Sequence, residues 1–162
     1  MALITFICTG NICRSPMAEG ILKKKLNDIN RSDIAVSSMG IHGLEGHPAS
    51  NYAIDICKIE GIDLSMHSSR PLIPEELVKC NLVLTMEILH NEFILTYFPR
   101  IKDKTFLLGA WPQSGTKKNN IEDPIGGSIN RYRKSFKEIS FQIERILPLL
   151  LVRFPKASQS EQ

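Results

Sequence analysis

The sequence predicts an α/β fold, a single domain in which helices cover both faces of a four-stranded parallel sheet. Three observations support this prediction. Short apolar runs typical of buried strands alternate with longer segments whose apolar residues have helical spacing. A chain of 162 residues suits one domain with one sizeable core. Hydrophobic residues make up 43% of the chain and charged residues 23%, which is an ordinary composition for a globular domain.

The first strand and helix are predicted near the N-terminus. Leu3 to Ile7 is a continuous apolar run, as expected of a strand buried on both faces. A helix is expected from Met17 to about Asn27, with Ser15 as its N-cap. Pro16 stands at the first helical position, where no N–H donor is needed. A second strand follows at residues 34–36.

Further elements continue the alternation of strand and helix. Gly61 ends a helix predicted over residues 49–60, and Pro99 stops another over residues 87–97. The remaining segments are a loop at 40–50, a strand at 81–86, a strand at 105–108, and a loop at 112–128 that is rich in Gly, Pro, Asn and Lys.

The last helix has the clearest periodicity. Apolar side chains from Ile129 to Leu150 recur at alternating intervals of three and four residues, which places them on one helix face. Pro148 is expected to kink or end this helix, because proline lacks the backbone N–H. We expect the folded domain to span residues 1–154 and the polar tail at residues 155–162 to be disordered.

Charge and cysteine content narrow the classes of function. The formal net charge is +3, and the densest basic run, residues 23–25, fits a solvated helix face, so we expect no nucleic-acid partner. No apolar run is long enough to span a bilayer, and the N-terminus lacks the features of a signal peptide, so we expect no membrane insertion. The four cysteines form no dense disulfide framework, which favours free thiols in a reducing cytoplasm.

The stretch CTGNICRSP, residues 8–16, has the features of an anion site. It leads from the first strand into a helix N-terminus, where backbone N–H groups and the helix dipole attract negative charge. Arg14 adds a planar fork that matches two phosphate oxygens. Gly10 permits a backbone conformation that a Cβ would hinder, and Asn11 suits a left-handed position. We therefore expect a phosphate loop made of Thr9, Gly10, Asn11, Ile12, Cys13, Arg14 and Ser15.

Cys8 lies at the base of this phosphate loop. Positive potential there favours the thiolate, and a thiolate that faces bound phosphate is a nucleophile aimed at phosphorus. A metal site would need a second Cys or His pair at suitable spacing, and the sequence has none. A purely structural cysteine is a weaker interpretation of C-x5-R-S-P between a strand and a helix, and the ATP-type phosphate loop is absent. We expect no metal and no cofactor.

The stretch CTGNICRSPMAEG resembles the signature of the low-molecular-weight protein tyrosine phosphatases. The similarity continues through VSSMGIHGLEGHPAS, GIDLSMHSSRPL, NLVLTME and IEDP, so it covers nearly the whole chain up to about Leu150. Among family members, the chain looks most like the bacterial enzymes encoded with exopolysaccharide export systems. The family fold is a four-stranded parallel sheet flanked by helices, which agrees with the independent prediction above.

The resemblance implies hydrolysis through a phosphocysteine intermediate. Cys8 would attack phosphorus, Arg14 would bind the phosphoryl group, and Asp123 in IEDP would be the general acid, because the matching Asp-Pro carries the acid in the family. Glu122 is a minor alternative for the acid. The network of hydrogen bonds beneath the family's phosphate loop corresponds to Asn11, Ser15, Ser38 and His67.

The remaining cysteines and histidines are expected to have other roles or positions. The resemblance implies a reversible Cys8–Cys13 disulfide that shields Cys8 from irreversible oxidation, although a small buried residue would also explain Cys13. Cys57 and Cys80 are expected in the core. The other histidines show no motif and are expected in loops or on the surface: His42, His47 and His90.

The chain departs from the family where a substrate ring would bind. Many members have an aromatic residue after the Asp-Pro pair and another in the loop after the second strand. Ile125 and Leu44 stand at the matching positions, and together with Ile12 they are expected to line the substrate groove. An aliphatic groove lacks aromatic stacking, worth roughly 0.5–1.5 kcal/mol, so strict phosphotyrosine specificity is in question.

Four functions remain open at this point. The favoured one is a cytoplasmic phosphatase that acts on a phosphotyrosine protein, such as a tyrosine kinase of exopolysaccharide export. Arginine phosphatases that resemble this family carry Thr in place of Ile12, although IGGS after Pro124 also resembles some of them. Arsenate reduction would require two further, closely spaced cysteines, which are absent. A non-catalytic phosphate-binding module would tolerate loss of Cys8 or Asp123, and both are present.

Overall fold

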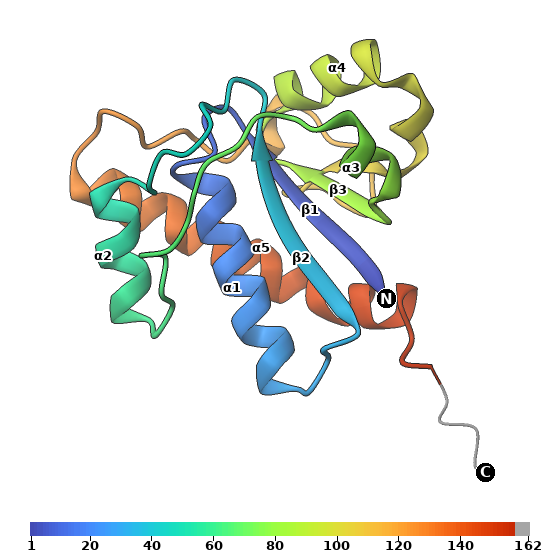
Figure 1. Ribbon diagram of the computed structural model, residues 1–162, viewed down its shortest axis with the longest axis horizontal. Helices are drawn as coiled ribbons and strands as arrows, with labels where there is room; N and C mark the ends of the chain where they lie inside the picture. Colours follow the sequence, from blue (N-terminus) through green and yellow to red (C-terminus); the bar gives the residue numbers. More distant parts are fainter. Residues whose placement is uncertain (158–162) are drawn as a thin grey trace.

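The computed structural model describes residues 1–157 and confirms the predicted α/β fold (Figure 1). Its four strands form one sheet in the order β2-β1-β3-β4, and each neighbouring pair is parallel. The elements are, in chain order, β1 (Ala2–Cys8), α1 (Arg14–Asp28), β2 (Ile34–Gly40), α2 (Asn51–Ile59), α3 (Pro74–Lys79), β3 (Leu82–Thr85), α4 (Ile88–Tyr97), the 3₁₀ helix η1 (Pro99–Lys104), β4 (Thr105–Leu107), the 3₁₀ helix η2 (Lys117–Asn119) and α5 (Ile129–Arg153).

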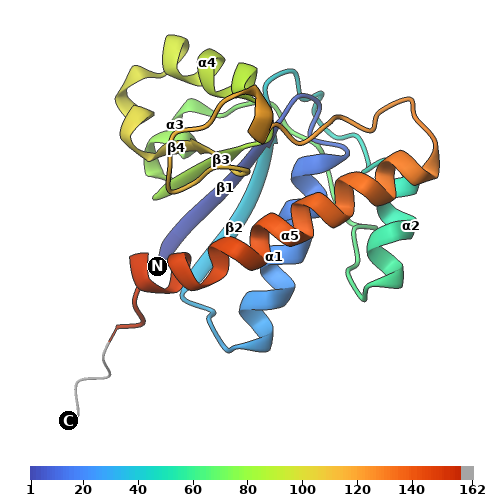
Figure 2. The ribbon, with the colours of Figure 1, turned by 180° about the vertical axis from the view of Figure 1, so that it is seen from behind.

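Helices cover both faces of the sheet, as Figure 2 shows from behind. The helices α1 and α5 lie on one face, with α2 packed against both, and α3 and α4 lie on the other. Alternate residues of β1 serve these two layers, as the period of two in a strand requires. Ile4 and Phe6 belong to the larger buried cluster beneath α1 and α5, whereas Ile7 packs with Leu77 of α3 and Ile94 of α4.

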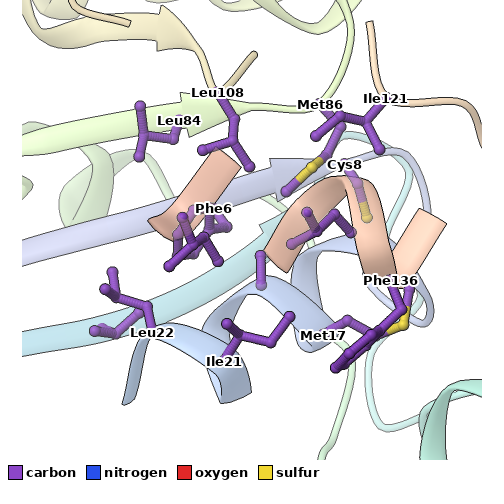
Figure 3. Packing of buried hydrophobic residues seen from close by; sticks show 14 of the residues in the cluster. Phe6, Cys8, Met17, Ile21, Leu22, Leu84, Met86, Leu108, Ile121 and Phe136 are labelled. Carbon is purple, nitrogen blue, oxygen red and sulfur yellow. The ribbon is translucent and has the colours of Figure 1, made fainter. Parts of the chain in front are cut away.

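The carboxyl end of β1 places Cys8 at one end of the larger cluster, with Met86 in the same cluster (Figure 3). Cys8 pairs in register with Gly40, the last residue of β2, and Ile7 pairs with Thr85, the last residue of β3. The loops that follow these strands therefore meet at one edge of the sheet. In open parallel sheets, this edge is where ligands bind.

The start of α1 differs from the prediction. The helix begins at Arg14 and its N-cap is Cys13, so the prediction of Ser15 as N-cap is wrong. The physical reason is that the Ser15 hydroxyl makes hydrogen bonds inside the phosphate loop instead. Pro16 is therefore the third helical residue and not the first. It is still tolerated there, because N–H groups in the first turn have no partner within the helix.

The sequence did not predict the short helices or the last turn of α5. The six residues of α3 and of η1 each carry too little periodicity to be recognised in the sequence, and η2 lies inside the predicted loop at 112–128. The long helix α5 does not end at Pro148 but continues to Arg153. Ile146 and Leu150, both fully buried, anchor this last part to the core.

Residues 155–157 of the predicted polar tail form neither helix nor strand, and residues 158–162 lie outside the described part of the chain. Across residues 1–157, none of the helices combines the length and the apolar character that crossing a membrane requires.

Candidate active site

The phosphate loop, residues 9–15, depends on two special backbone positions. Asn11 has a φ of 56°, the left-handed conformation that was predicted for it. We predicted that Gly10 adopts a backbone conformation that a Cβ would hinder, and this is wrong. Its φ is not positive, and an added Cβ would lie 3.6 Å from the Ile12 side chain, which is an ordinary van der Waals contact. The required glycine is Gly40 at the end of β2, where an added Cβ would lie 2.7 Å from the carbonyl oxygen of Thr9.

Asn11 is also the centre of a buried hydrogen-bond network beneath the loop. Its amide Nδ2 donates to Oγ of Ser15 and to Oγ of Ser38, each at 2.9 Å. Its Oδ1 accepts from the backbone N–H of Arg70 at 3.0 Å. Nε2 of His67 lies 2.7 Å from the carbonyl oxygen of Asn11, so this nitrogen carries the donated proton. The structure thus brings together all four residues that the resemblance suggested for this network.

Ser15 connects this network to Cys8, the predicted nucleophile. Its Oγ lies 2.9 Å from Sγ of Cys8. Because Oγ already accepts a hydrogen bond from Asn11, its own proton is available to donate to the sulfur, which stabilises a thiolate. Ser38 donates in turn to Glu19 of α1 at 2.5 Å. Sequence reasoning missed Glu19, since a glutamate within a helix gives no signal beyond that of a surface residue.

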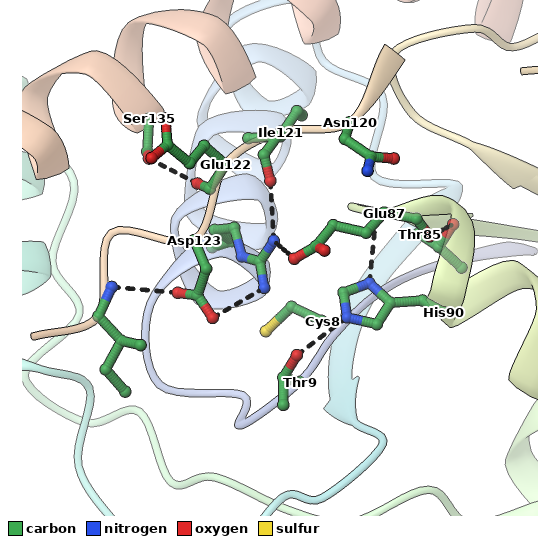
Figure 4. A network of polar contacts seen from close by, with 12 residues as sticks. Cys8, Thr9, Thr85, Glu87, His90, Asn120, Ile121, Glu122, Asp123 and Ser135 are labelled. Carbon is green, nitrogen blue, oxygen red and sulfur yellow. Dashed lines mark hydrogen bonds and ion pairs between the residues drawn. The ribbon is translucent and has the colours of Figure 1, made fainter. Parts of the chain in front are cut away.

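Arg14 is almost fully buried, and its guanidinium is held by two carboxylates, those of Glu87 and Asp123, which Figure 4 labels. Nη1 donates to the carboxylate of Glu87 and, at 2.8 Å, to the carbonyl oxygen of Ile121, while Nη2 donates to Oδ2 of Asp123 at 3.0 Å. The Nε–H group is buried and has no partner within residues 1–157. Nε and Nη2 form one edge of the guanidinium fork, so this edge suits two oxygens of a phosphoryl group.

The two candidate acids differ in orientation. Oδ1 of Asp123 accepts from the N–H of Ile125 at 3.1 Å, and its Oδ2 faces Arg14. The carboxylate of Glu122 is directed toward α5, where it accepts from Arg131 at 2.6 Å and is mostly exposed. This geometry favours Asp123 over Glu122 as the proton donor.

Two residues near the start of α4 belong to the site although sequence reasoning missed them. Glu87, the N-cap of α4, binds Arg14. His90 was expected in a loop or on the surface, and this is wrong, because it lies in the first turn of α4, is 5% exposed and contacts Thr9. Only the pairing of β3 beside β1 brings this helix end to the phosphate loop. The one available signal was that Glu87 closely follows an apolar strand.

Cys13, the second cysteine of the loop, is a buried thiol. Its Sγ lies 3.4 Å from Oγ of Ser50 and 3.3 Å from the hydroxyl of Tyr132, and burial raises its pKa. All four cysteines are free and buried, which confirms the core positions predicted for Cys57 and Cys80. The Cys8–Cys13 disulfide implied under oxidation stays a prediction.

The predicted groove residues lie at the surface or at the edge of the core. Leu44 is 65% exposed and Ile125 is 53% exposed, while Ile12 is half-buried against the larger cluster. Their contact with a substrate ring stays a prediction. His42 and His47 are exposed, as was expected of them.

Comparison with known proteins decides the family. The model described as "Low molecular weight phosphotyrosine protein phosphatase" matches residues 3–160. The chain belongs to the low-molecular-weight protein tyrosine phosphatase family. The phosphatase Etp of Escherichia coli (strain K12) is 36% identical over 145 residues, which cover 88% of this chain and 87% of Etp. A protein-arginine-phosphatase of Geobacillus stearothermophilus is 39% identical over 143 residues, with 88% and 92% covered.

A solved structure of this family of phosphatases agrees with the fold. The low-molecular-weight protein tyrosine phosphatase from T. tengcongensis superposes with a TM-score of 0.83 at 34% sequence identity, over 92% of this chain and 99% of that one. Family membership confirms the resemblance found in the sequence and makes this chain a cysteine-dependent phosphatase.

Proposed function

We propose that this phosphatase hydrolyses phosphotyrosine in proteins, with Cys8 as the nucleophile, Arg14 as the phosphate ligand and Asp123 as the general acid. One observation carries the proposal. Sγ of Cys8 lies at the base of the phosphate loop with the Ser15 hydroxyl 2.9 Å away, and the buried Nε–H group of Arg14 in the same site has no partner in the described part of the chain.

The first chemical step transfers the phosphoryl group to sulfur. Sγ of Cys8 attacks phosphorus, and the bond between phosphorus and the leaving oxygen breaks. Backbone N–H groups of the loop and the Arg14 guanidinium stabilise the charge on the phosphoryl oxygens. Asp123, in its carboxylic acid form, gives its proton to the leaving oxygen.

The second step releases phosphate. Water attacks the phosphorus of the phosphocysteine, and the Asp123 carboxylate takes a proton from this water. The bond between phosphorus and sulfur breaks, and Cys8 leaves as a thiolate. The proton of the Ser15 hydroxyl, which is not needed elsewhere in the network, stabilises this thiolate as it departs.

Two features favour tyrosine over arginine as the phosphorylated residue, although one of the relatives above is named an arginine phosphatase. Ile12 has no hydroxyl group that could place a water for attack, and Ile12, Leu44 and Ile125 offer apolar surface to an aromatic ring. We further propose that this phosphatase is cytoplasmic and that its natural substrate is a tyrosine kinase of exopolysaccharide export. The resemblance of nearly the whole chain, up to about Leu150, to bacterial members encoded with such systems supports this choice.

Matched peptides test the proposal. We would measure kcat/KM on three peptides of one sequence that carry phosphotyrosine, phosphoarginine or phosphoserine. We expect the phosphotyrosine peptide to be the best substrate, and Ile12→Thr to shift the ratio toward phosphoarginine. Faster hydrolysis of the phosphoarginine peptide by the wild-type enzyme would make arginine phosphatase the correct function.

A substitution of Cys8 tests its proposed role as the nucleophile. Cys8→Ser should fold and bind inorganic phosphate but lose turnover, because a neutral hydroxyl in this site is a far weaker nucleophile than a thiolate. Rapid-quench experiments on the wild-type enzyme should trap phosphate on Cys8. Substantial hydrolysis by Cys8→Ser would show that another residue attacks phosphorus.

A further inference from the structure

His90 takes no part in the proposed chemistry, yet it connects two parts of the active site. The side chain is almost fully buried in the first turn of α4. Its Nδ1 accepts from the backbone N–H of Glu87 at 3.1 Å, and its Nε2 lies 3.0 Å from Oγ1 of Thr9. Figure 4 shows Cys8 between this pair of residues, Thr9 and His90, and Asp123.

The two hydrogen bonds determine which nitrogen carries the proton. The backbone N–H of Glu87 is a donor, so Nδ1 of His90 must be unprotonated. Burial, together with the charge of Arg14, lowers the pKa of His90 to about 4, so the imidazole is neutral at pH 7. Its single proton is therefore on Nε2, which donates to Oγ1 of Thr9.

Charged and titratable groups face the His90 ring from several elements. Arg14 of α1 disfavours a second positive charge, and His42 in the loop after β2 acts in the same direction. Asp123 in the loop before α5 acts in the opposite direction. Glu87, on the same helix end as His90, directs its carboxylate to Arg14. A neutral His90 therefore leaves the carboxylates of Glu87 and Asp123 to Arg14, whereas a protonated His90 would compete with Arg14 for them.

We propose that His90 is a positioning residue, whose neutral imidazole ties Thr9 of the phosphate loop to the same helix end that holds Arg14 through Glu87. Thr9 directly follows Cys8 in the sequence, and Arg14 supplies the fork proposed to bind the phosphoryl group. The start of α4 therefore sets both parts of the phosphate site relative to one another. The proposal rests on the proposed phosphatase function, because its effect is on the binding of a phosphoryl group.

Two substitutions separate the two hydrogen bonds of His90. Asparagine places its side-chain oxygen near the position of Nδ1, so His90→Asn can accept from Glu87 but does not reach Thr9. Glutamine places its amide nitrogen near the position of Nε2, so His90→Gln can donate to Thr9. Calorimetry with inorganic phosphate measures the site without requiring turnover. We expect His90→Asn to weaken phosphate binding about tenfold, and His90→Gln to stay within about threefold of the wild type.

Thr9→Val provides the matched partner variant, since it removes the hydroxyl and keeps the shape of the side chain. If His90 acts through Thr9, the double variant with His90→Asn binds phosphate no more weakly than either single variant. Kinetics on a phosphotyrosine peptide should show the loss in kcat as well as in KM. A merely structural role would lower Tm and leave the phosphate affinity of the folded protein unchanged.

Several outcomes of these experiments would overturn the proposed role of His90. Unchanged phosphate affinity in His90→Asn, or additive losses in the double variant, would overturn the proposal. If His90→Asn does not fold, Thr9→Ser and Thr9→Val take its place, and equal phosphate affinities in these two variants would overturn it. A wild-type protein that binds phosphate but cleaves no phosphopeptide would instead contradict the proposed function, and the binding test of His90 would still hold.

Discussion

Among single residues, Arg14 shows most clearly how this site is held together. A buried guanidinium is destabilising unless its charge is paired, and Glu87 and Asp123 provide that pairing. The Nε–H group, which has no partner among residues 1–157, is left for a substrate oxygen. The same Asp123 that pairs with Arg14 is the proposed proton donor, so the proposed phosphate ligand would also place the acid beside the substrate.

The role of Asp123 predicts a dependence on the leaving group. Asp123→Asn should slow hydrolysis of a phosphotyrosine peptide by about 10²–10⁴-fold, the usual contribution of general acid catalysis. Activated aryl phosphates need less protonation, so they should lose much less. Steady-state kinetics on both substrates would measure the difference. Glu122→Gln is the matched control and should leave both rates within about twofold, because its carboxylate is directed toward α5. Equal losses on both substrates in Asp123→Asn would remove Asp123 from the role of acid.

At the scale of elements, the end of β2 supports the phosphate loop. Gly40 pairs with Cys8 in the register of the sheet, and an added Cβ would lie 2.7 Å from the Thr9 carbonyl oxygen and 2.9 Å from the Asn11 backbone nitrogen. These neighbours are backbone atoms, so they cannot turn aside as a flexible side chain would. The strand also carries Ser38, which binds Asn11. The conformation of the loop therefore depends on β2 as much as on the loop's own residues.

The close approach of Gly40 to the backbone of the phosphate loop predicts what an added methyl group would do at this position. Gly40→Ala should push the phosphate loop out of place and weaken binding of inorganic phosphate by about tenfold or more. Gly46→Ala is the control, since Gly46 lies in the neighbouring loop with nothing within 4 Å of an added Cβ. Its φ of 83° makes alanine there unfavourable by about 1 kcal/mol, so this variant should lose stability but keep phosphate affinity. Calorimetry measures the phosphate affinity of each variant, and thermal unfolding measures its stability. Normal phosphate binding in Gly40→Ala would contradict the prediction.

At the scale of the whole molecule, burying neutral His90 couples the active site to stability in acid. Its pKa is about 4 in the folded protein and returns toward 6.5 on unfolding. Between these pH values the unfolded chain binds more protons than the folded chain, so the free energy of unfolding falls as pH falls. This shift in the pKa of His90 corresponds to about 3 kcal/mol of the free energy of unfolding, at about 1.4 kcal/mol per pKa unit. Asp33, whose pKa Arg31 lowers to about 2, adds stability that is lost only below about pH 4.

Denaturant unfolding at several pH values tests this coupling. The free energy of unfolding of the wild-type protein should fall between pH 6.5 and pH 4 more steeply than that of His90→Gln, which has no titrating imidazole. Asp33→Asn is the contrasting variant: above pH 4.5 its curve should run parallel to that of the wild type but lower, because the stabilisation by Asp33 is missing, and the two curves should converge only in stronger acid. Parallel curves for the wild type and His90→Gln would mean that His90 does not keep its lowered pKa in solution.

The sequence by itself determined the alternation of strands and helices and the place of the phosphate loop after the first strand, and it predicted Cys8 as the nucleophile. These features are local: CTGNICRSP is a single contiguous stretch, and apolar periodicity reports which face of each element is buried. Asp123 and the network with Ser38 and His67 came from the family resemblance, because nothing in the composition around them points to Cys8.

Only the tertiary structure decided which distant residues complete the site. Gly40, Glu87 and His90 are separated from Cys8 by tens of residues, and each looks ordinary in its own segment. The sheet order β2-β1-β3 aligns the carboxyl ends of three parallel strands, so the end of β2 and the start of α4 lie on either side of the phosphate loop. Contacts made across a sheet depend on strand order and register, and no local pattern of residues encodes either of these.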